Sequence, residues 1–297
     1  MDFPFALGCL SIRMIPDPEE KLILHGAYIP EHSIPLMVGI SGGEPYLING
    51  YFFCRVANRI ILIGYPIGRD FDADDFRNTI EMVKSKYDPI HIAFIAPELP
   101  SGWFACSEHE SDEYLTLQLE QEIPGRLKTV AEKAGRQVSV EVGKAFTQYH
   151  KELGMEFIER VSPPPRIRAL MDRMEHYLAS ANDAFLLNAW TAEGELAAFY
   201  VLDLWPAEFA TYVIGCYSKE PYVPYVSDLL FLEMIKLSRA KGKTYIHLGL
   251  GVNEGIRRFK RKWGGVPSRK YELCELAVRQ PRIAESLMSY LNRIIPQ

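Results

Sequence analysis

The segment from His247 to Gly265 constrains this chain more than any other part of the sequence. An apolar strand ends in a glycine-broken turn, and a short, strongly basic helix follows and stops at two glycines. At about 100° per residue, the apolar side chains of this helix share one face. That face is formed by Ile256, Phe259 and Trp263, whereas Arg257, Arg258, Arg261 and Lys262 fall outside it.

Lys260 differs from the other basic residues of this helix. It lies about 40–60° from Ile256 and Trp263 around the helix axis, on the side expected to face the core. Removing an ammonium group from water is costly unless a partner compensates for the lost hydration. Either the stem of Lys260 packs on the core while its head reaches water, or an anionic group comes to it. The residues alone leave both roles open.

The composition limits what the rest of the molecule can be. With 297 residues the chain is long enough for two ordinary domains, and its 48% hydrophobic and 24% charged residues are usual for a globular protein. The formal net charge is -5, and the sequence pI is about 5.9. The protein as a whole is therefore not a general binder of polyanions. Contact with nucleic acid or phosphate would need a local patch, for which the basic helix is the best candidate.

The cysteines and the start of the chain bear on its cellular environment. Five scattered cysteines with no closely spaced pair predict a reducing compartment rather than a disulfide framework or a zinc site. The first residues include an acid and no basic residue before Arg13, unlike a secretory signal. No apolar run reaches the ~18–20 residues of a membrane-spanning helix. We therefore expect a cytoplasmic protein with no metal site. The cysteines are Cys9, Cys54, Cys106, Cys216 and Cys274.

The first half, 1–122, predicts the order strand, strand, helix, strand after an irregular, proline-rich start. Ala57-Asn58 separates the first two strands as a hairpin turn. The polar and acidic stretch 100–113 then leads to a strand near the domain boundary. The expected elements are strands at Tyr46–Arg55, Ile60–Tyr65, Ile90–Ala96 and Tyr114–Leu119, and a helix after Asp72.

The second half, 123–297, has clearer helix caps and turn residues. From its first strand onward it predicts the order β-α-α-β-β-β-α-β-α-β-α. Ser227 and Asn253 are the expected N-caps of two of its helices. The expected strands are Gln137–Val142, Phe185–Thr191, Leu196–Leu204, Phe209–Tyr217, Tyr245–Leu250 and Lys270–Leu276. The expected helices are Arg126–Ala134, Phe146–Ile158, one from Pro165, one from Ser227, the basic helix and Pro281–Ile295.

Two segments of this half resemble a known family. The run RFKRKWGG at Arg258–Gly265 resembles the lysine, aromatic and Gly-Gly signature of Fem-type aminoacyltransferases. Tyr225–Gly249 is similar to the helix-then-strand segment of the same family and of the soluble domains of aminoacyl-phosphatidylglycerol synthases. These proteins share the GNAT acyltransferase fold, whose element order the second half matches. The resemblance covers 114–276, and the preceding residues add only an echo of the element order.

The resemblance implies a fold and a role for Lys260. The fold is α/β (α+β), with tandem GNAT-like domains, mixed central sheets flanked by helices, and a reduced N-terminal copy. In the family, the signature lysine is thought to stabilise charge at the reacting ester carbonyl, and Lys260 occupies its position. An ammonium in a low-dielectric site is an effective stabiliser of a developing oxyanion. Asn253 and the backbone at Gly249 and Gly251 would orient the acyl group in a cleft between two splayed strands.

The segment 219–228 departs from the GNAT enzymes that use acetyl-CoA. Those enzymes hold the cofactor's phosphates with a glycine-rich loop before the central helix. This segment has no glycine, and Pro221 and Pro224 donate no N–H. The donor therefore stays unknown, as an acyl-CoA bound in another mode or an aminoacyl-tRNA. The expected acceptor is a small-molecule or peptide amine. Contact with tRNA would use the basic helix.

The other candidate residues each have a structural and a functional interpretation. Tyr222 and Tyr225 either donate a proton to a leaving group or only pack near the cleft. His247 is a general base or a hydrogen-bonded strand histidine. The basic residues outside the apolar face form a phosphate footprint or a solvated surface. The candidates for substrate contact, besides Asn253 and the two glycines, are Arg257, Arg258 and Trp263.

Two functions from different classes fit these observations. The leading hypothesis is an acyl- or aminoacyl-transferase in which an amine attacks a thioester or ester carbonyl in a GNAT-type cleft. The alternative is a non-catalytic GNAT-fold protein that binds a small acylated or anionic ligand or a protein partner. The absence of the phosphate loop from the sequence is compatible with both. The oligomeric state is not predicted.

Overall fold

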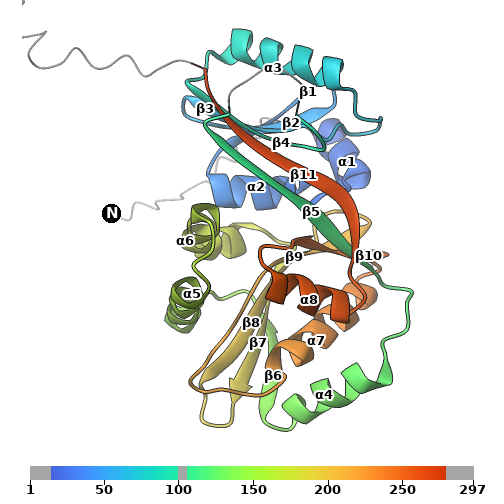
Figure 1. Cartoon of the computed structure of the whole chain (residues 1–297), viewed down its shortest axis with the longest axis vertical. Coiled ribbons are helices and arrows are strands. Elements are labelled where there is room, and N and C mark those ends of the chain that lie inside the picture. The colour runs from blue at the N-terminus through green and yellow to red at the C-terminus, as the bar shows by residue number, and fades with distance from the viewer. Residues whose placement is uncertain (1–14, 100–105, 279–297) are drawn as a thin grey trace, which may run out of the picture.

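The computed structural model describes residues 15–99 and 106–278, and its strands form one continuous sheet (Figure 1). Over these ranges the sheet has 11 strands in the order β1-β2-β3-β4-β11-β5-β10-β9-β8-β7-β6. The strands are β1 (Glu44–Ile48), β2 (Tyr51–Val56), β3 (Arg59–Ile63), β4 (His91–Ala96), β5 (Glu108–Gln118), β6 (Val138–Gly143), β7 (Ala184–Thr191), β8 (Leu196–Asp203), β9 (Phe209–Tyr217), β10 (Tyr245–Leu250) and β11 (Val266–Ala277).

Helices cover both faces of this sheet. In the N-terminal half α3 lies on one face and α2 on the other, and α2 packs against α6 of the C-terminal half (Figure 1). The helices are α1 (Asp17–Gly26), η1 (Pro30–His32), α2 (Ile34–Ser41), α3 (Ala73–Tyr87), α4 (Gly125–Gly135), α5 (Gln148–Val161), α6 (Pro165–Ser180), α7 (Val226–Ala240) and α8 (Glu254–Lys262).

Two long strands join the halves. β5 and β11 lie side by side and run diagonally across the molecule (Figure 1). β11 comes last among the described strands, yet it pairs with β4 of the first half, for example Leu273 with Ile95. The predicted mixed sheet with flanking helices is confirmed, and the two halves share that sheet. The division into 1–122 and 123–297 stays a prediction.

The cores lie on opposite faces of the sheet, as the alternation of side chains on β8 shows. Phe199 and Val201 pack into the core under α5 and α6. Tyr200 and Leu202, which point the other way, pack into the core with α4 and α7. All four side chains are almost fully buried, which explains why β8 is apolar along its whole length.

Some element boundaries differ from the sequence predictions. The start of the chain contains α1 and α2 rather than irregular structure, and the strand predicted at Tyr46–Arg55 is two strands joined by a turn at Asn49-Gly50. Residues 108–113 of the polar and acidic stretch belong to β5, where most of them are exposed. α7 begins one residue before Ser227, and its N-cap is Tyr225, so the predicted Ser227 cap is wrong. The helix predicted at Pro281–Ile295 lies outside the described residues.

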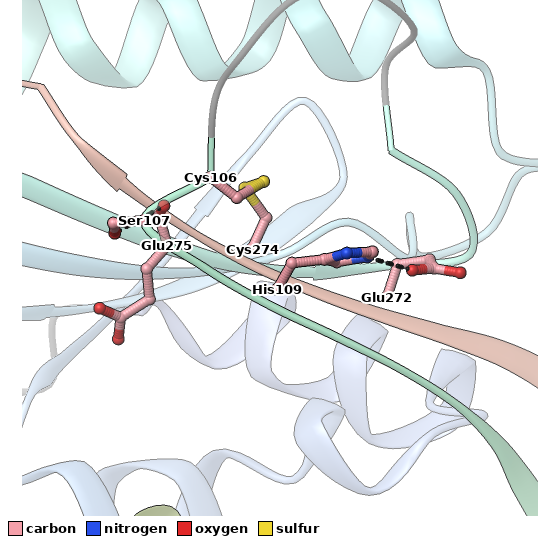
Figure 2. The surroundings of a disulfide bond; sticks show 6 residues. All are labelled: Cys106, Ser107, His109, Glu272, Cys274 and Glu275. Carbon is pink, nitrogen blue, oxygen red and sulfur yellow. Dashed lines mark hydrogen bonds and ion pairs between the residues drawn. A yellow bond between two sulfur atoms is a disulfide. The ribbon is translucent and has the colours of Figure 1, made fainter.

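A disulfide links Cys106 to Cys274, with a Cα–Cα distance of 5.4 Å (Figure 2). Beside it, the backbone N–H of Ser107 donates to the carbonyl of Glu275. The expectation that the cysteines form no disulfide is therefore wrong for this pair. The two residues are 168 positions apart, so only the β5–β11 pairing brings them together. Cys54 and Cys216 are free and buried, and Cys9 lies outside the described residues.

None of the helices in 15–99 and 106–278 has the length and apolarity that crossing a bilayer requires.

We predict that Cys106 and Cys274 resist alkylation until a reductant is added. Denatured, unreduced protein treated with iodoacetamide should carry the label on Cys54 and Cys216 but not on the linked pair, as read by peptide mass spectrometry. Cys106→Ser should lower the melting temperature, because the link restricts the unfolded chain. Labelling of both Cys106 and Cys274 in the unreduced protein would contradict the bond.

Candidate functional site

β9 and β10 separate in the middle of the sheet. They pair in parallel only from Tyr245–Phe209 to His247–Thr211, although both strands continue beyond this point. A bulge lies on each side of the separation, at Val213 in the β8–β9 ladder and at Leu248 in the β5–β10 ladder. Bulges increase twist and bend a strand, so they account for the divergence. The predicted cleft between these strands therefore has a structural basis.

A cavity of about 910 Å³ opens at this separation. Its wall includes Tyr200 and Phe259 from the core on the α7 side of the sheet, and Phe157 and Ile167 from the core on the α6 side. Side chains from both faces can line one space because the separated strands leave the sheet open between them. Its volume lies in the usual range for small-molecule sites.

Lys260 reaches this cavity from α8 and is only 4% exposed. Its Nζ donates to the carbonyl of Leu248 at 2.5 Å and to the carbonyl of Leu250 at 2.6 Å. The ring of Tyr212 lies below the ammonium, with its centroid 5.6 Å from Nζ. An ammonium has three N–H donors, so two bonds to carbonyls leave the third for a group in the cavity. The predicted inward position of Lys260 is confirmed.

Burial lowers the pKa of Lys260 from its usual 10.5 to about 7. The carboxylate of Asp112 acts in the opposite direction, and the guanidinium of Arg257 lowers the pKa further. Near neutral pH the amine is therefore close to its midpoint between the charged and neutral forms. Lys260 can supply positive charge to a reacting carbonyl at pH values up to about 7.

Asp112 organises the turn between β10 and α8, and the sequence interpretation missed it. One carboxylate oxygen accepts from the backbone N–H groups of Gly251 and Val252, at 3.1 and 3.3 Å. The other accepts from Arg257 at 3.0 Å. This arrangement explains how Val252 keeps its left-handed φ of 54°. Asp112 belongs to the polar and acidic stretch 100–113, and nothing in the sequence indicates its distant partners.

Three predicted substrate-binding residues shape the start of α8. Asn253 caps the helix as predicted, because its side chain accepts from the N–H of Ile256 at 2.9 Å. Asn253 and Gly249 also line the cavity. A Cβ at Gly251 would lie 2.6 Å from the guanidinium of Arg257, so this glycine makes room for the Arg257–Asp112 pair. Arg257 is thus held by Asp112 and does not extend freely into solvent.

Trp263 and Arg258 lie away from the cavity lining. Trp263 is 4% exposed, donates from Nε1 to Asp228 at 2.9 Å, and stacks on Phe231. These contacts give it a core-packing role that joins α8 to α7. Arg258 is exposed on the outer side of α8. A substrate-contact role for either residue stays a prediction.

The two tyrosines predicted near the cleft point to solvent. Tyr222 is 60% exposed and Tyr225 is 49% exposed, and neither lines the cavity. Tyr225 adopts a left-handed φ of 64° as the N-cap of α7. Their predicted proton-transfer role remains without support from this geometry.

His247 is fully buried beside the cavity rather than in its wall. Its ring meets the ring of Tyr114 edge-on at 4.9 Å, and its Nδ1 accepts from the N–H of Gly249. Burial, together with the nearby charge of Lys260, lowers the pKa of His247 to about 3. The imidazole is therefore neutral at physiological pH. Its position fits a packed strand histidine better than a general base.

Tyr200 and Tyr212 are cavity residues that the sequence interpretation missed. Their ring centroids lie 4.8 Å apart, and the Tyr200 hydroxyl donates to the carbonyl of Ser227 at 3.0 Å. Burial raises the pKa of both hydroxyls above the usual 10. Both groups therefore stay protonated and can donate hydrogen bonds. The sequence did not indicate their position in the cavity, because an aromatic residue on a buried strand normally packs in the core.

The described residues contain no group of His, Cys, Asp and Glu arranged to hold a metal ion.

Comparison with known proteins places this geometry in a structural class. No family model and no curated protein sequence matches the chain. Among solved structures, L-PGS from Bacillus licheniformis is similar over 93% of this chain and 96% of its own, with 15% identity and a TM-score of 0.53. FemX matches 87% of this chain and 96% of its own, with 11% identity and a TM-score of 0.54. A tandem GNAT protein from the clavulanic acid biosynthesis pathway matches 89% and 94%, with 12% identity and a TM-score of 0.51.

These similarities confirm the predicted fold, which is a tandem GNAT-like fold of the kind found in Fem-type proteins. At such low identities they show the fold alone.

We predict that Asp112→Ala destabilises the protein by about 2–4 kcal/mol, because it removes the acceptor of two backbone N–H groups and of Arg257. Chemical denaturation would measure the loss. Glu113→Ala, at the next position on the same strand and exposed, is the matched control and should change stability by less than about 0.5 kcal/mol. Equal effects of the two substitutions would show that Asp112 does not hold the turn.

Proposed function

We propose that this protein is an acyl- or aminoacyl-transferase, in which an amine attacks a thioester or ester carbonyl held where β9 and β10 separate. The observation that carries the proposal is Lys260, a buried lysine that lines the cavity and whose Nζ donates to two carbonyls, which leaves one N–H for a ligand. A positive charge fixed in a dry site stabilises the oxyanion that forms when a nucleophile adds to a carbonyl. The GNAT-like fold supports a transferase by analogy.

The proposed acyl transfer accounts for each bond and each proton. The amine nitrogen bonds to the carbonyl carbon, and the carbonyl oxygen takes up negative charge beside Lys260. When this intermediate collapses, the bond from carbon to sulfur or oxygen breaks. The nitrogen loses a proton, and the leaving atom gains one. Tyr212, whose ring lies beside Lys260 and whose hydroxyl stays protonated, is the group that we assign to this proton transfer.

The donor class follows from the segment before α7. Pro221 and Pro224 supply no N–H there, and the helix N-terminus begins at a left-handed Tyr225. We therefore favour a donor whose phosphates, if any, are not bound by a glycine-rich loop. An acyl-CoA in another binding mode and an aminoacyl-tRNA both satisfy this condition. The exposed Arg258 and Arg261 on α8 provide a basic surface for tRNA, and a small-molecule or peptide amine is the acceptor.

One observation favours the second candidate, a non-catalytic binding protein. The carbonyls of Leu248 and Leu250 lie where β10 no longer pairs with β9, and Lys260 satisfies both. This contact alone accounts for a buried lysine, because unpaired buried carbonyls are costly. In this case Lys260 would support the cavity wall and perform no chemistry.

Lys260→Met separates the two functions. With purified protein and a panel of acyl-CoAs, charged tRNAs and amines, we expect kcat/KM to fall by about 10²–10³-fold, while ligand binding persists. The matched control is Lys243→Met, because Lys243 also donates to two carbonyls but lies outside this cavity. The control should retain activity. No turnover with any donor, together with unchanged ligand binding in Lys260→Met, would favour the binding protein.

The pKa of Lys260 also predicts a pH dependence of stability. Because its pKa is about 7 in the folded chain and 10.5 when exposed, the unfolded state binds more protons between these values. Stability relative to Lys260→Met should therefore rise with pH from about 7 to 10, by up to a few kcal/mol. Urea denaturation of both proteins across this range measures the difference. A difference that does not change with pH would show that Lys260 titrates normally.

In the enzyme, the pH profile of kcat/KM should show a falling limb near pH 7, since oxyanion stabilisation needs the ammonium form of Lys260. A rate that keeps rising through pH 8 would instead indicate that the neutral amine is the active form.

A further inference from the structure

We propose that the cavity binds a long aliphatic chain, and that this chain is the acyl group of the donor. The position of the carbonyl at Lys260 rests on the proposed function. The binding of the chain rests on the cavity itself and is tested separately.

The floor of the cavity is a broad apolar area of the N-terminal half of the sheet. Ile61, Ala93 and Glu275 form one row of facing residues across β3, β4 and β11. Ile95 and Leu273 belong to the next row on the same face. All five line the cavity, and only Glu275 at the outer row is charged. Flat, apolar strand faces of this kind suit an extended hydrocarbon.

The roof consists of apolar side chains from helices of both halves. Ile40 of α2 and Ile167 and Leu170 of α6 line the cavity and remain half-buried inside the molecule. Half-buried side chains at the junction of two packed helices still have apolar surface to cover. A ligand of matching character would bury that surface, at about 25 cal/mol per Å² of area removed from water.

The residues that line the cavity come from several neighbouring strands of the sheet. Lys260 contacts carbonyls of β10, while the floor reaches β3, and the strands between them are β5, β11 and β4. Four strand spacings correspond to about 19 Å. A short acyl group such as acetyl would occupy only the end at Lys260. The remaining length has no function in acetyl transfer.

Some polar groups of the wall are already paired with other side chains. The Tyr114 hydroxyl donates to Glu31 at 2.7 Å, and burial raises the pKa of this carboxyl. Arg166 forms two bonds with Glu110. The wall therefore offers few free partners to a sugar, a nucleotide or a peptide, and what it presents to a ligand is mainly hydrocarbon.

Arg59 and His91 lie on the same sheet face at the far end of the cavity, beyond the Ile61–Ala93 row. They form a polar rim opposite Lys260. A chain that starts at Lys260 and follows the floor meets mainly apolar residues, with Glu275 as the charged exception, before it reaches this rim. Chain length should therefore increase binding affinity only until the chain reaches this rim.

The experiment measures binding of a graded series to the full-length protein by isothermal titration and native mass spectrometry. The probes are acetyl-CoA, octanoyl-CoA and palmitoyl-CoA, with palmitate and hexadecylamine as unreactive single-chain probes. We expect affinity to rise by about tenfold or more from acetyl-CoA to octanoyl-CoA and to be highest for palmitoyl-CoA, because a longer chain removes more apolar surface from water. Equal affinities across the series would overturn the proposal.

A variant that fills the cavity tests the location. Ala93→Phe places a ring on the floor and should weaken palmitoyl-CoA and palmitate at least tenfold, while acetyl-CoA is unaffected. Ala192→Phe, in the exposed β7–β8 turn, is the size-matched control and should bind as the parent does. If Ala93→Phe does not fold, Ile167→Gln on the roof, at a half-buried helix position, replaces it. Unchanged palmitate binding in the folded cavity variant excludes this site.

One comparison decides whether the aliphatic chain belongs to the donor or to the acceptor. Another distinguishes failure of the chain site from failure of the proposed transferase. Hexadecylamine that binds while palmitate and palmitoyl-CoA do not would assign the chain to the acceptor and overturn a donor chain. Graded binding of the acyl-CoAs that is blocked by Ala93→Phe supports the chain site, even if Lys260→Met shows no loss of turnover. The loss of turnover in Lys260→Met with equal binding across the series keeps the transferase and removes the chain site.

Discussion

The two bonds from the Lys260 ammonium to the carbonyls of β10 are the contact on which the rest of this structure depends. A sheet that opens between two central strands leaves backbone groups without their ladder partners, and a buried carbonyl without a donor is costly. Lys260 compensates from a helix rather than from a strand, so the sheet can remain open. One side chain, Lys260, pairs with the carbonyls that β9 leaves free, and the space between β9 and β10 stays open as the cavity. The helix that carries Lys260 is in turn fixed by Asn253 and by Asp112.

The sequence was informative wherever the physical cause was local. The periodicity of the basic helix placed Lys260 inward, and Asn253 is a cap because its side chain serves an N–H three residues ahead. The central strand β8 was predictable because a strand buried on both faces is apolar along its whole length. The family signature covered the same residues, and it agreed with the element order that predicted the tandem GNAT-like fold.

The features that the sequence did not indicate all depend on partners far along the chain. Asp112 contacts the β10–α8 turn, which lies more than a hundred residues later in the chain. Tyr114 of β5 donates to Glu31 of η1, which lies 83 residues earlier. The pair Cys106–Cys274 looked like isolated thiols because only the β5–β11 register joins them. Tyr222 and Tyr225 show the opposite case. They lie close in sequence to the cleft, but their side chains are exposed to solvent. Local pattern predicts which way a side chain faces on its element, but not which element it meets.

The late position of β11 in the chain has a consequence for biogenesis. β4 and β5 are completed early in synthesis, but the strand that separates and pairs with both of them is residues Val266–Ala277. Until that strand leaves the ribosome, the N-terminal half has two unsatisfied strand edges, which are favourable sites for intermolecular pairing. The N-terminal half can therefore complete its part of the sheet only after β11 has been made, and chaperone protection would matter most before that point.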